Sequence, residues 1–363
     1  MKISIFGCGN AGSAVAADLS LKGHSVTLVK SSNVTIHSDH YQYIRRHNTI
    51  TLEEDGIIHN ANICVSEDIQ TAISHADVLI IFIQTNYHED LIKRICKYLS
   101  DGQIVILEPG YLSTSFFLQN TNSDITIIEA ESSPVDCRIL EPGLVSVLFR
   151  NTCNPFGVYP SRNKSQAENA LTQLGYPYII IDSVVEAALH NPNLILHTIG
   201  SIFSVPRIEY INKQGGRYFM YREVFTPHVW NLVLALDDEK INVLKKLGLP
   251  PTTYLEACKQ RNSKDDRSAE TVFWDYANNS SPEGPYDINS RYVTEDISQG
   301  LVLLESLGLM LKVLTPVCSS LIDCASALYQ KNFRANGRTV EKLSAKALET
   351  ILRDSATVIQ EDE

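Results

Sequence analysis

The glycine-rich turn at the start of the chain limits its fold more than any other feature. A short apolar segment, 2–6, leads directly into Gly-Cys-Gly-Asn-Ala-Gly at 7–12, and a run of small residues over 13–22 follows. In a strand–turn–helix unit the first glycine makes a tight turn, the second lets the backbone approach a pyrophosphate, and the third lets helix and strand pack closely. The N–H groups at the helix start then bind the anion. The pattern predicts a nicotinamide or flavin dinucleotide held by Gly7, Gly9, Asn10, Ala11 and Gly12.

Composition narrows the class of protein. At 363 residues the chain is long for one core, so two domains are expected. A net charge of −11 argues against nucleic acid or an anionic membrane surface as the main partner. No apolar run approaches the about 20 residues that span a bilayer. The eight cysteines include no CxxC pair, and no signal peptide is recognisable, which predicts reduced thiols and a cytoplasmic location.

Strand-length apolar runs alternate with helical patterns through the first half of the chain. The expected strands after the first are 24–29, 77–83, 103–107, 124–128 and 178–181, and the expected helices after the first are 87–99 and 161–174. Continuous apolar runs suit parallel strands that are covered on both faces. Two strands without an intervening helix, over 144–159, are expected to be antiparallel additions. The sequence therefore predicts an α/β domain over residues 1–183 with a Rossmann-type, mostly parallel sheet.

Strand patterns end near Ser183, and the rest of the chain is predicted to be helical. The expected helices are 184–203, 226–247, 294–312, 315–329 and 339–358. Two of them begin with Thr-Pro, an N-cap followed by proline at the first helical position. Residues 184–363 are therefore predicted to form an all-α substrate domain, with the polar segment 278–291 as a lid or substrate loop.

The end of the second strand bears on the choice of cofactor. NAD-preferring sites usually place an acid there, whereas this chain has Lys30 and Ser31. A lysine beside hydroxyl groups attracts a 2′-phosphate, so NADP(H) is favoured over NAD(H); the alternative is that Lys30 is a surface residue and the ribose is held elsewhere. No further glycine-rich segment of the kind found in flavoenzymes follows. Since ligands bind at the carboxyl ends of parallel strands, Thr85, Asn86 and Glu108 are expected to contact the cofactor.

A polar stripe is expected on the first helix of the second domain. Glu186, His190, Asn193 and His197 are spaced to lie on one helical face, and Pro192 should kink that helix. One interpretation is that these side chains form hydrogen bonds with one another in the core or face solvent. A metal site is a second, but the spacing is too long for one ion, so no metal is expected. The third is a catalytic wall facing the nicotinamide.

A second group of polar residues lies about a hundred positions later. Arg291 follows the polar loop, and Asp296 is expected in the first turn of the next helix. An arginine there would bind a substrate carboxylate as a planar fork, and an aspartate close to a histidine would orient its ring. The alternative for Glu295 and Asp296 is that they interact with the helix dipole.

At these motifs the chain resembles the octopine/opine dehydrogenase family, over nearly its whole length. The motifs are HNPNLILH at 190–197, a tyrosine and a proline six residues apart at 221–227, and RYVTEDISQGLV at 291–302. The resemblance implies an N-terminal NAD(P) domain followed by a helical domain of the 6-phosphogluconate-dehydrogenase-like kind.

The resemblance also implies roles for individual residues. His197 would pair with Asp296 and act as the general acid/base, while Arg291 would bind carboxylate; Asn193 would anchor the substrate or the nicotinamide amide. The implied reaction condenses an amino acid with a 2-oxo acid, and hydride from the nicotinamide reduces the imine to a secondary amine. Domain closure would exclude water during that step.

Two other functions remain open at this point. One is a 2-oxo or 3-hydroxy acid reductase of the ketopantoate type, although such enzymes carry a catalytic lysine on the first long helix of the second domain, and none occurs between Ser183 and Arg207. The other is a sensor that holds NADP(H) without turnover. A homodimer is compatible with the sequence.

Overall fold

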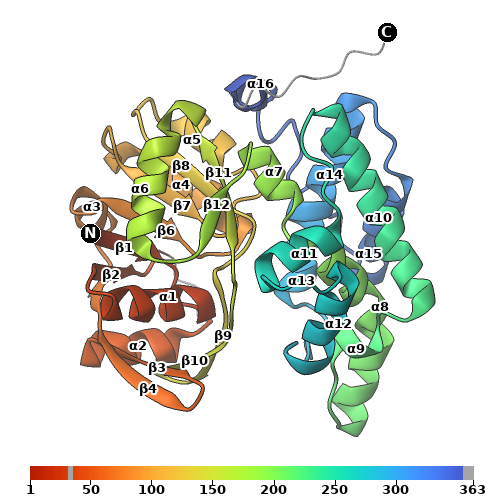
Figure 1. Cartoon of the computed structure of the whole chain (residues 1–363), viewed down its shortest axis with the longest axis horizontal. Helices are drawn as coiled ribbons and strands as arrows, with labels where there is room; N and C mark the ends of the chain where they lie inside the picture. The colour runs from red at the N-terminus through yellow and green to blue at the C-terminus, as the bar shows by residue number, and fades with distance from the viewer. Residues whose placement is uncertain (32–35, 355–363) are drawn as a thin grey trace. The chain divides into compact units, whose positions relative to one another are not determined.

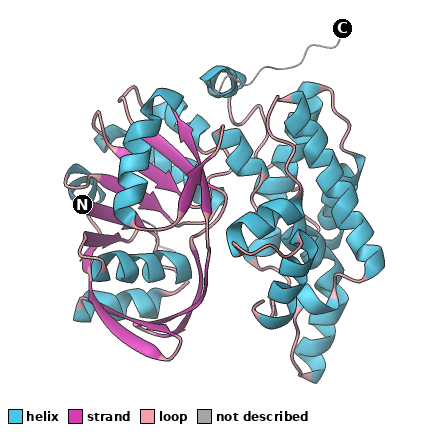
Figure 2. Ribbon diagram, viewed as in Figure 1, coloured by secondary structure: helices cyan, strands magenta, loops and turns pink. Residues whose placement is uncertain are grey.

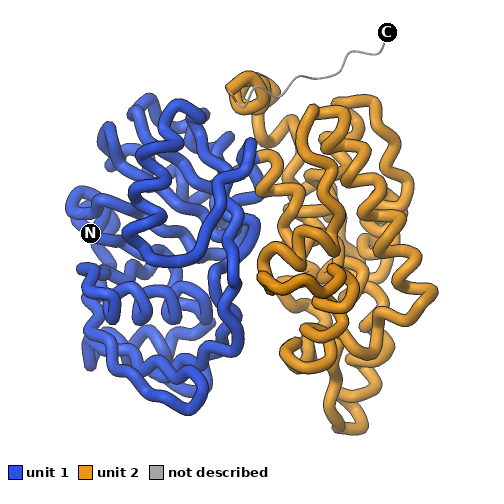
Figure 3. The backbone as a smooth tube through the Cα atoms, viewed as in Figure 1, with its two compact units in different colours: residues 1–184 blue, residues 185–363 orange. Residues whose placement is uncertain are grey.

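The chain divides into two compact units, Met1–Val184 and Val185–Glu363 (Figure 3). The computed structural model describes residues 1–31 and 36–354. Unit 1 holds all the strands of the described residues and unit 2 is helical (Figure 2).

The main sheet of unit 1 has eight strands in the order β12-β11-β8-β7-β6-β1-β2-β5 (Figure 1). Its strands are β1 (Lys2–Phe6), β2 (Ser25–Val29), β5 (Cys64–Ser66), β6 (Val78–Ile81), β7 (Ile104–Leu107), β8 (Thr126–Ala130), β11 (Asn154–Tyr159) and β12 (Tyr178–Ile180). Neighbours from β5 to β8 pair in parallel, and β11 pairs antiparallel to β8. The predicted Rossmann-type, mostly parallel sheet is confirmed.

Six helices accompany the strands in the described part of unit 1. They are α1 (Asn10–Leu21), α2 (Ser38–His47), α3 (Ile69–Ser74), α4 (His88–Ile95), α5 (Thr114–Asn120) and α6 (Lys164–Leu174), with short 3-10 turns at η1 (Thr85–Tyr87), η2 (Cys96–Tyr98) and η3 (Ser161–Asn163). The small residues of α1 are buried from Gly12 to Ala17, which lets this helix approach the sheet closely.

A second, four-stranded sheet was not predicted. It has the order β4-β3-β10-β9, formed by β3 (Thr49–Glu54), β4 (Ile57–Asn62), β9 (Val135–Glu141) and β10 (Leu144–Arg150). The two strands expected over 144–159 as antiparallel additions are β10 and β11. Strand β11 pairs antiparallel to β8 in the main sheet, while β10 belongs to the second sheet, where it pairs antiparallel with β9 and parallel with β3. The Asp55-Gly56 dipeptide between β3 and β4 is a hairpin signal that could have revealed the first pair.

Unit 2 is built from helices. They are α7 (Val184–Leu189), which crosses the unit boundary, α8 (Asn193–Gln214), α9 (Met220–Glu223), α10 (Pro227–Lys246), α11 (Tyr254–Asn262), α12 (Ala269–Asn279), α13 (Arg291–Thr294), the π-helical turn η4 (Asp296–Leu301), α14 (Val302–Leu311), α15 (Pro316–Tyr329) and α16 (Ala345–Asp354). The predicted helices at 226–247 and 315–329 match α10 and α15. Part of the one predicted at 339–358 lies outside the described residues.

Two helices of unit 2, α11 and α12, were missed by the sequence analysis. In each helix the side chain of the N-cap residue accepts a hydrogen bond from a backbone N–H: Thr253 accepts from Glu256 in a capping box, and Ser268 accepts from Thr271. Both caps are readable in the sequence. Among the helices of the described residues, none is long and apolar enough to cross a membrane.

Candidate functional site

The glycine turn after β1 has the geometry of a nucleotide cradle. Gly7 has a φ of 123°, and a Cβ there would lie 2.7 Å from the Phe82 carbonyl oxygen. A Cβ on Gly12 would lie 2.0 Å from the Gly7 carbonyl oxygen. The first and third glycines are therefore required by the protein itself, whereas a Cβ on Gly9 would meet nothing closer than 3.7 Å. That open space at Gly9 fits the close approach of a ligand.

The first turn of α1 follows this cradle. No side chain caps the helix at Gly9, so its first N–H groups suit an anion. The Asn10 side-chain oxygen accepts a hydrogen bond from the Ile139 backbone N–H at 2.8 Å, which ties the turn to β9. Asn10 and Ala11 therefore present mainly backbone groups to this helix end.

Two cationic side chains lie at the end of β2. The Lys30 Nζ lies 4.9 Å from the centroid of the Tyr41 ring, and the Arg94 guanidinium of α4 donates a hydrogen bond to the Ser31 carbonyl. Arg94 was missed because only the fold brings α4 to the end of β2.

The ends of β6 and β7 carry unsatisfied acceptors. Thr85 is fully buried in η1, and the next residue, Asn86, has a buried Oδ1. Glu108 follows β7, where its N–H donates to the Ile81 carbonyl at 3.1 Å, and its Oε2 is also buried. Within residues 1–31 and 36–354, neither of these two oxygens has a hydrogen-bond partner. Burial raises the pKa of Glu108 to about 8. Orphaned polar atoms at this edge fit a ligand that supplies hydrogen-bond donors.

His88, the first residue of α4, has a fully buried side chain. Its Nδ1 lies 2.8 Å from the Ser113 Oγ, and its Nε2 lies 3.1 Å from the Ile83 carbonyl. The ring thus joins the segment after β6 to the start of α5.

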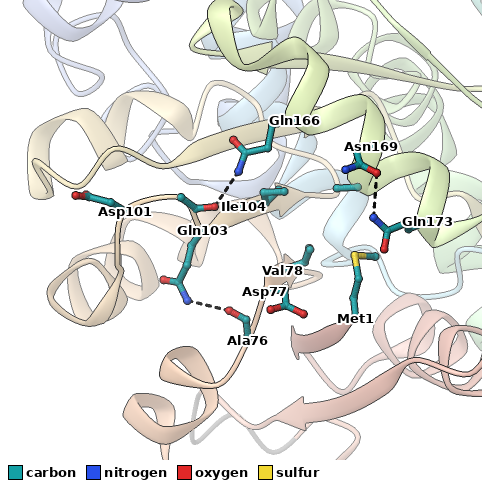
Figure 4. Close-up of a pocket in the computed structure, with 12 residues that line it drawn as sticks. Met1, Ala76, Asp77, Val78, Asp101, Gln103, Ile104, Gln166, Asn169 and Gln173 are labelled. Atoms are coloured by element: carbon teal, nitrogen blue, oxygen red, sulfur yellow. Dashed lines mark hydrogen bonds between the residues drawn. The ribbon is translucent and has the colours of Figure 1, made fainter.

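A depression at the opposite, amino-terminal end of the strands does not belong to this site (Figure 4). Met1, Asp77 and Gln103 line it, together with residues of α6. Its amide groups bond within the protein: Gln103 donates to the Ala76 carbonyl, and Gln173 donates to Asn169 (Figure 4). These groups are already satisfied, so the depression offers a ligand little.

In unit 2 the structure brings His197 and Asp296 together. His197 lies on α8 and Asp296 begins η4; the Nδ1 and Oδ2 atoms are 2.9 Å apart. The side chains are 6% and 1% exposed. Because a carboxylate only accepts hydrogen bonds, Nδ1 carries the proton, and in the neutral ring Nε2 is then the basic atom.

An aromatic ring fixes the plane of this histidine. Tyr292 of α13 stacks on His197 with ring centroids 3.5 Å apart and an angle of 17° between the planes. Tyr221 of α9 contributes an edge contact at 6.5 Å. This role of Tyr292 was not predicted, although its position four residues before Asp296 places it one helical turn away.

Arg291 lies on the same short helix. Its guanidinium is half exposed, and its Nη1 lies 3.8 Å from the Glu295 Oε2. An exposed fork of this kind is able to bind a carboxylate.

The predicted polar stripe was wrong as a continuous face. Helix α7 ends at Leu189 and α8 begins at Asn193, so Glu186 and His197 lie on different helices. Pro192 immediately precedes α8 instead of kinking a longer helix, because proline fits best before the first full turn. Asn193 donates its backbone N–H to the Asn191 Oδ1 at 2.9 Å, as the first residue of α8.

His190 lies in the break between these helices. Its side chain is buried, and neither ring nitrogen has a hydrogen-bond partner among the described residues. Burial, and then the charges of Lys240 and Arg261, hold the pKa of His190 well below 6.5. His190 and His197 therefore have different neighbours: His190 lies near two cations, and His197 bonds to a carboxylate.

Comparisons with known proteins cover both units. The family model described as NAD/NADP octopine/nopaline dehydrogenase, alpha-helical domain, matches residues 180–329, and that of the NAD-dependent glycerol-3-phosphate dehydrogenase N-terminus matches residues 2–121. The chain is 30% identical to an opine dehydrogenase from Arthrobacter sp. (strain 1C) over 357 residues, 95% of each protein.

Solved structures share the fold at low identity. An octopine dehydrogenase with NADH and L-arginine aligns with a TM-score of 0.75 and 16% identity over 100% of both chains. A yersinopine dehydrogenase with NADP⁺ aligns with a TM-score of 0.72 and 15% identity, covering 98% of this chain and 97% of that one.

Proposed function

Since this chain belongs to the octopine/nopaline dehydrogenase family, it is an NAD(P)-dependent oxidoreductase of the opine dehydrogenase type, and we propose that His197 is its general acid/base. The substrates are an amino acid and a 2-oxo acid, which condense to an imine that is reduced to a secondary amine. The observation that carries the assignment of His197 is its buried hydrogen bond with Asp296.

The pair suits proton transfer from the amine nitrogen and to the carbinolamine oxygen. Asp296 holds the proton on Nδ1 of His197, which leaves Nε2 as the basic atom. Nε2 accepts a proton from the amine nitrogen as the carbinolamine forms, and returns it to the hydroxyl group that leaves as water. The carboxylate stabilises the imidazolium that forms between these events. Stacking of Tyr292 keeps the ring in one plane, which limits the orientations of Nε2.

Arg291 binds a substrate carboxylate in this proposal. Both reactants carry carboxylates, and the half-exposed guanidinium offers two parallel N–H donors. Asn193, one turn before His197 on α8, is a second candidate contact for the substrate.

The dinucleotide is held by unit 1 and supplies a hydride when bound. The glycine cradle takes the pyrophosphate, and the ends of β6 and β7 supply Thr85, Asn86 and Glu108 as further contacts. The proposed preference for NADP(H) is supported by two cationic side chains at the end of β2: Lys30, whose Nζ lies over the Tyr41 ring, and Arg94, which donates to the Ser31 carbonyl. Replacing Arg94 with alanine should reduce the preference for NADPH over NADH about tenfold, since a charge-assisted hydrogen bond to phosphate is lost.

A cytoplasmic location completes the proposal. All eight cysteines are free thiols, as expected in a reducing compartment. Fractionation of cells that express the protein tests the location, and sedimentation tests whether it is a homodimer.

The activity is tested by following NADPH and NADH absorbance in parallel, with a 2-oxo acid alone and with a panel of amino acids. Oxidation that requires both reactants supports the proposal. Oxidation with the oxo acid alone would indicate a simple reductase instead, and cofactor binding without oxidation would indicate a sensor.

A further inference from the structure

Two buried glutamates at the carboxyl ends of neighbouring strands, β7 and β8, differ in their hydrogen bonding. Glu129, near the end of β8, is fully buried. Its Oε1 accepts hydrogen bonds from the backbone N–H and the hydroxyl of Thr114, each at 2.7 Å, and its Oε2 accepts one from the Leu112 N–H at 2.8 Å. These donors account for Glu129, which holds the loop before α5 in place.

Glu108 directly follows the neighbouring strand β7, and none of the described residues donates a hydrogen bond to its Oε2. Glu108 is 8% exposed, and this oxygen is buried. With no cation offsetting its burial, the pKa of this carboxyl rises to about 8. At neutral pH Glu108 is therefore mostly a neutral carboxylic acid, which offers one O–H donor and one carbonyl acceptor.

The place of Glu108 in the sheet indicates which part of a dinucleotide is near. The cradle that follows β1 takes the pyrophosphate, and β2 on one side takes the adenosine end, so the nicotinamide half extends over β6 and β7 on the other side. Strands are about 4.8 Å apart, which puts the end of β7 roughly 10 Å from that of β1. Asn86, in η1 after the strand between them, has a buried acceptor without a partner among the described residues.

We propose that Glu108 recognises the carboxamide of the nicotinamide ring, as a neutral acid that donates its O–H to the amide oxygen and accepts an amide N–H. An amide matches both groups of the acid, whereas an ammonium group of a substrate would need the ionised form. The inference rests on the dinucleotide of the proposed function but is independent of the reaction that follows.

The test measures cofactor binding without substrates. NADPH is compared with its reduced 3-acetylpyridine analogue, in which a methyl group replaces the amide NH₂. Wild-type protein should bind NADPH about tenfold more tightly than the analogue, because the analogue lacks the N–H donor. Glu108→Leu should weaken NADPH binding by a similar factor and bind both compounds equally. Glu108→Gln, a neutral donor and acceptor, should retain the wild-type preference.

Adenosine 2′,5′-bisphosphate, which lacks the nicotinamide, serves as the folding control. Its dissociation constant should be the same in all three proteins. The inference is overturned if Glu108→Leu keeps the preference for NADPH, or if Glu108→Gln loses as much affinity as Glu108→Leu. A protein with the predicted binding preference but no amine-dependent oxidation would contradict the proposed function and leave this inference standing.

Discussion

Two histidines of unit 2 are equally buried, yet their surroundings differ. His190 and His197 are each 5% exposed. His197 donates to the carboxylate of Asp296, whereas neither ring nitrogen of His190 has a hydrogen-bond partner among the described residues, and this ring lies near Lys240 and Arg261. The sequence placed both on one polar face, and burial alone would not distinguish them.

The comparison shows that neighbouring charged groups distinguish two histidines that are equally buried. A carboxylate partner favours the imidazolium, while neighbouring cations oppose it. Only a ring of the first kind is suited to general acid/base catalysis near neutral pH. His197 is therefore assigned to the reaction and His190 to the structure of the break between α7 and α8.

Replacing each histidine should give the largest contrast. His197→Ala should lower kcat by about 10³-fold or more, because the acid/base is removed. His190→Leu should keep kcat within a few-fold of wild type. Steady-state kinetics on both variants measure this, with cofactor affinity as the control for folding of unit 1. Equal losses of kcat in the two variants would contradict the different roles assigned to His190 and His197.

Asp296→Asn should have the next largest effect, lowering kcat by about 10²- to 10³-fold. The amide keeps the shape of the side chain but has an NH₂ group that favours the other tautomer of His197. The pH profile of kcat should also change, because the imidazolium loses its counter-charge. An unchanged pH profile would show that Asp296 does not act through the histidine.

Arg291→Met should mainly affect substrate binding. Loss of the guanidinium is expected to raise KM for the 2-oxo acid or the amino acid by about 10- to 100-fold, with a smaller change in kcat. Lysine at this position should recover only part of the loss, since it lacks the planar fork. Initial rates over a range of both substrates measure the effect, and an unchanged KM for both would remove Arg291 from the site.

The smallest effect concerns stability and pH. The pKa of His190 is well below 6.5 in the folded protein, so below that pH the unfolded chain binds a proton that the folded chain does not. The free energy of unfolding should therefore fall as the pH falls below 6.5, with this group contributing at most about 1.4 kcal/mol per pH unit. In urea unfolding at pH 7 and 5.5, His190→Leu should lose less stability than wild type; parallel losses would contradict the assignment.

Local patterns predicted the parts of the fold that depend on neighbouring residues. The glycine turn, the apolar strands of the main sheet and the Thr-Pro helix starts are of this kind. The second sheet was not predicted, because it joins β3 and β10, which are far apart in the chain. The sequence predicted one kinked helix through 190–192, because the helical spacing of the polar residues continues across Pro192, whereas the structure has two separate helices.

In the candidate site, too, contacts between residues far apart in the chain could not be predicted from local patterns. The resemblance supplied the pairing of His197 with Asp296, which spacing alone could not give. Arg94 and Tyr292 were missed because their relevance depends on which side chains the fold brings next to them. Whether a buried glutamate finds donors also depends on the fold. The Thr114 N–H donates to Glu129, whereas no described residue donates to the Glu108 Oε2.

The proposed reaction is tested most directly by tracing the hydride. The protein is incubated with [4,4-²H₂]NADPH, pyruvate and a mixture of amino acids, and the products are analysed by mass spectrometry. The account predicts a secondary amine that carries one deuterium on the former keto carbon of pyruvate, formed by wild type and lost in His197→Ala. Deuterium found only in a 2-hydroxy acid would contradict it.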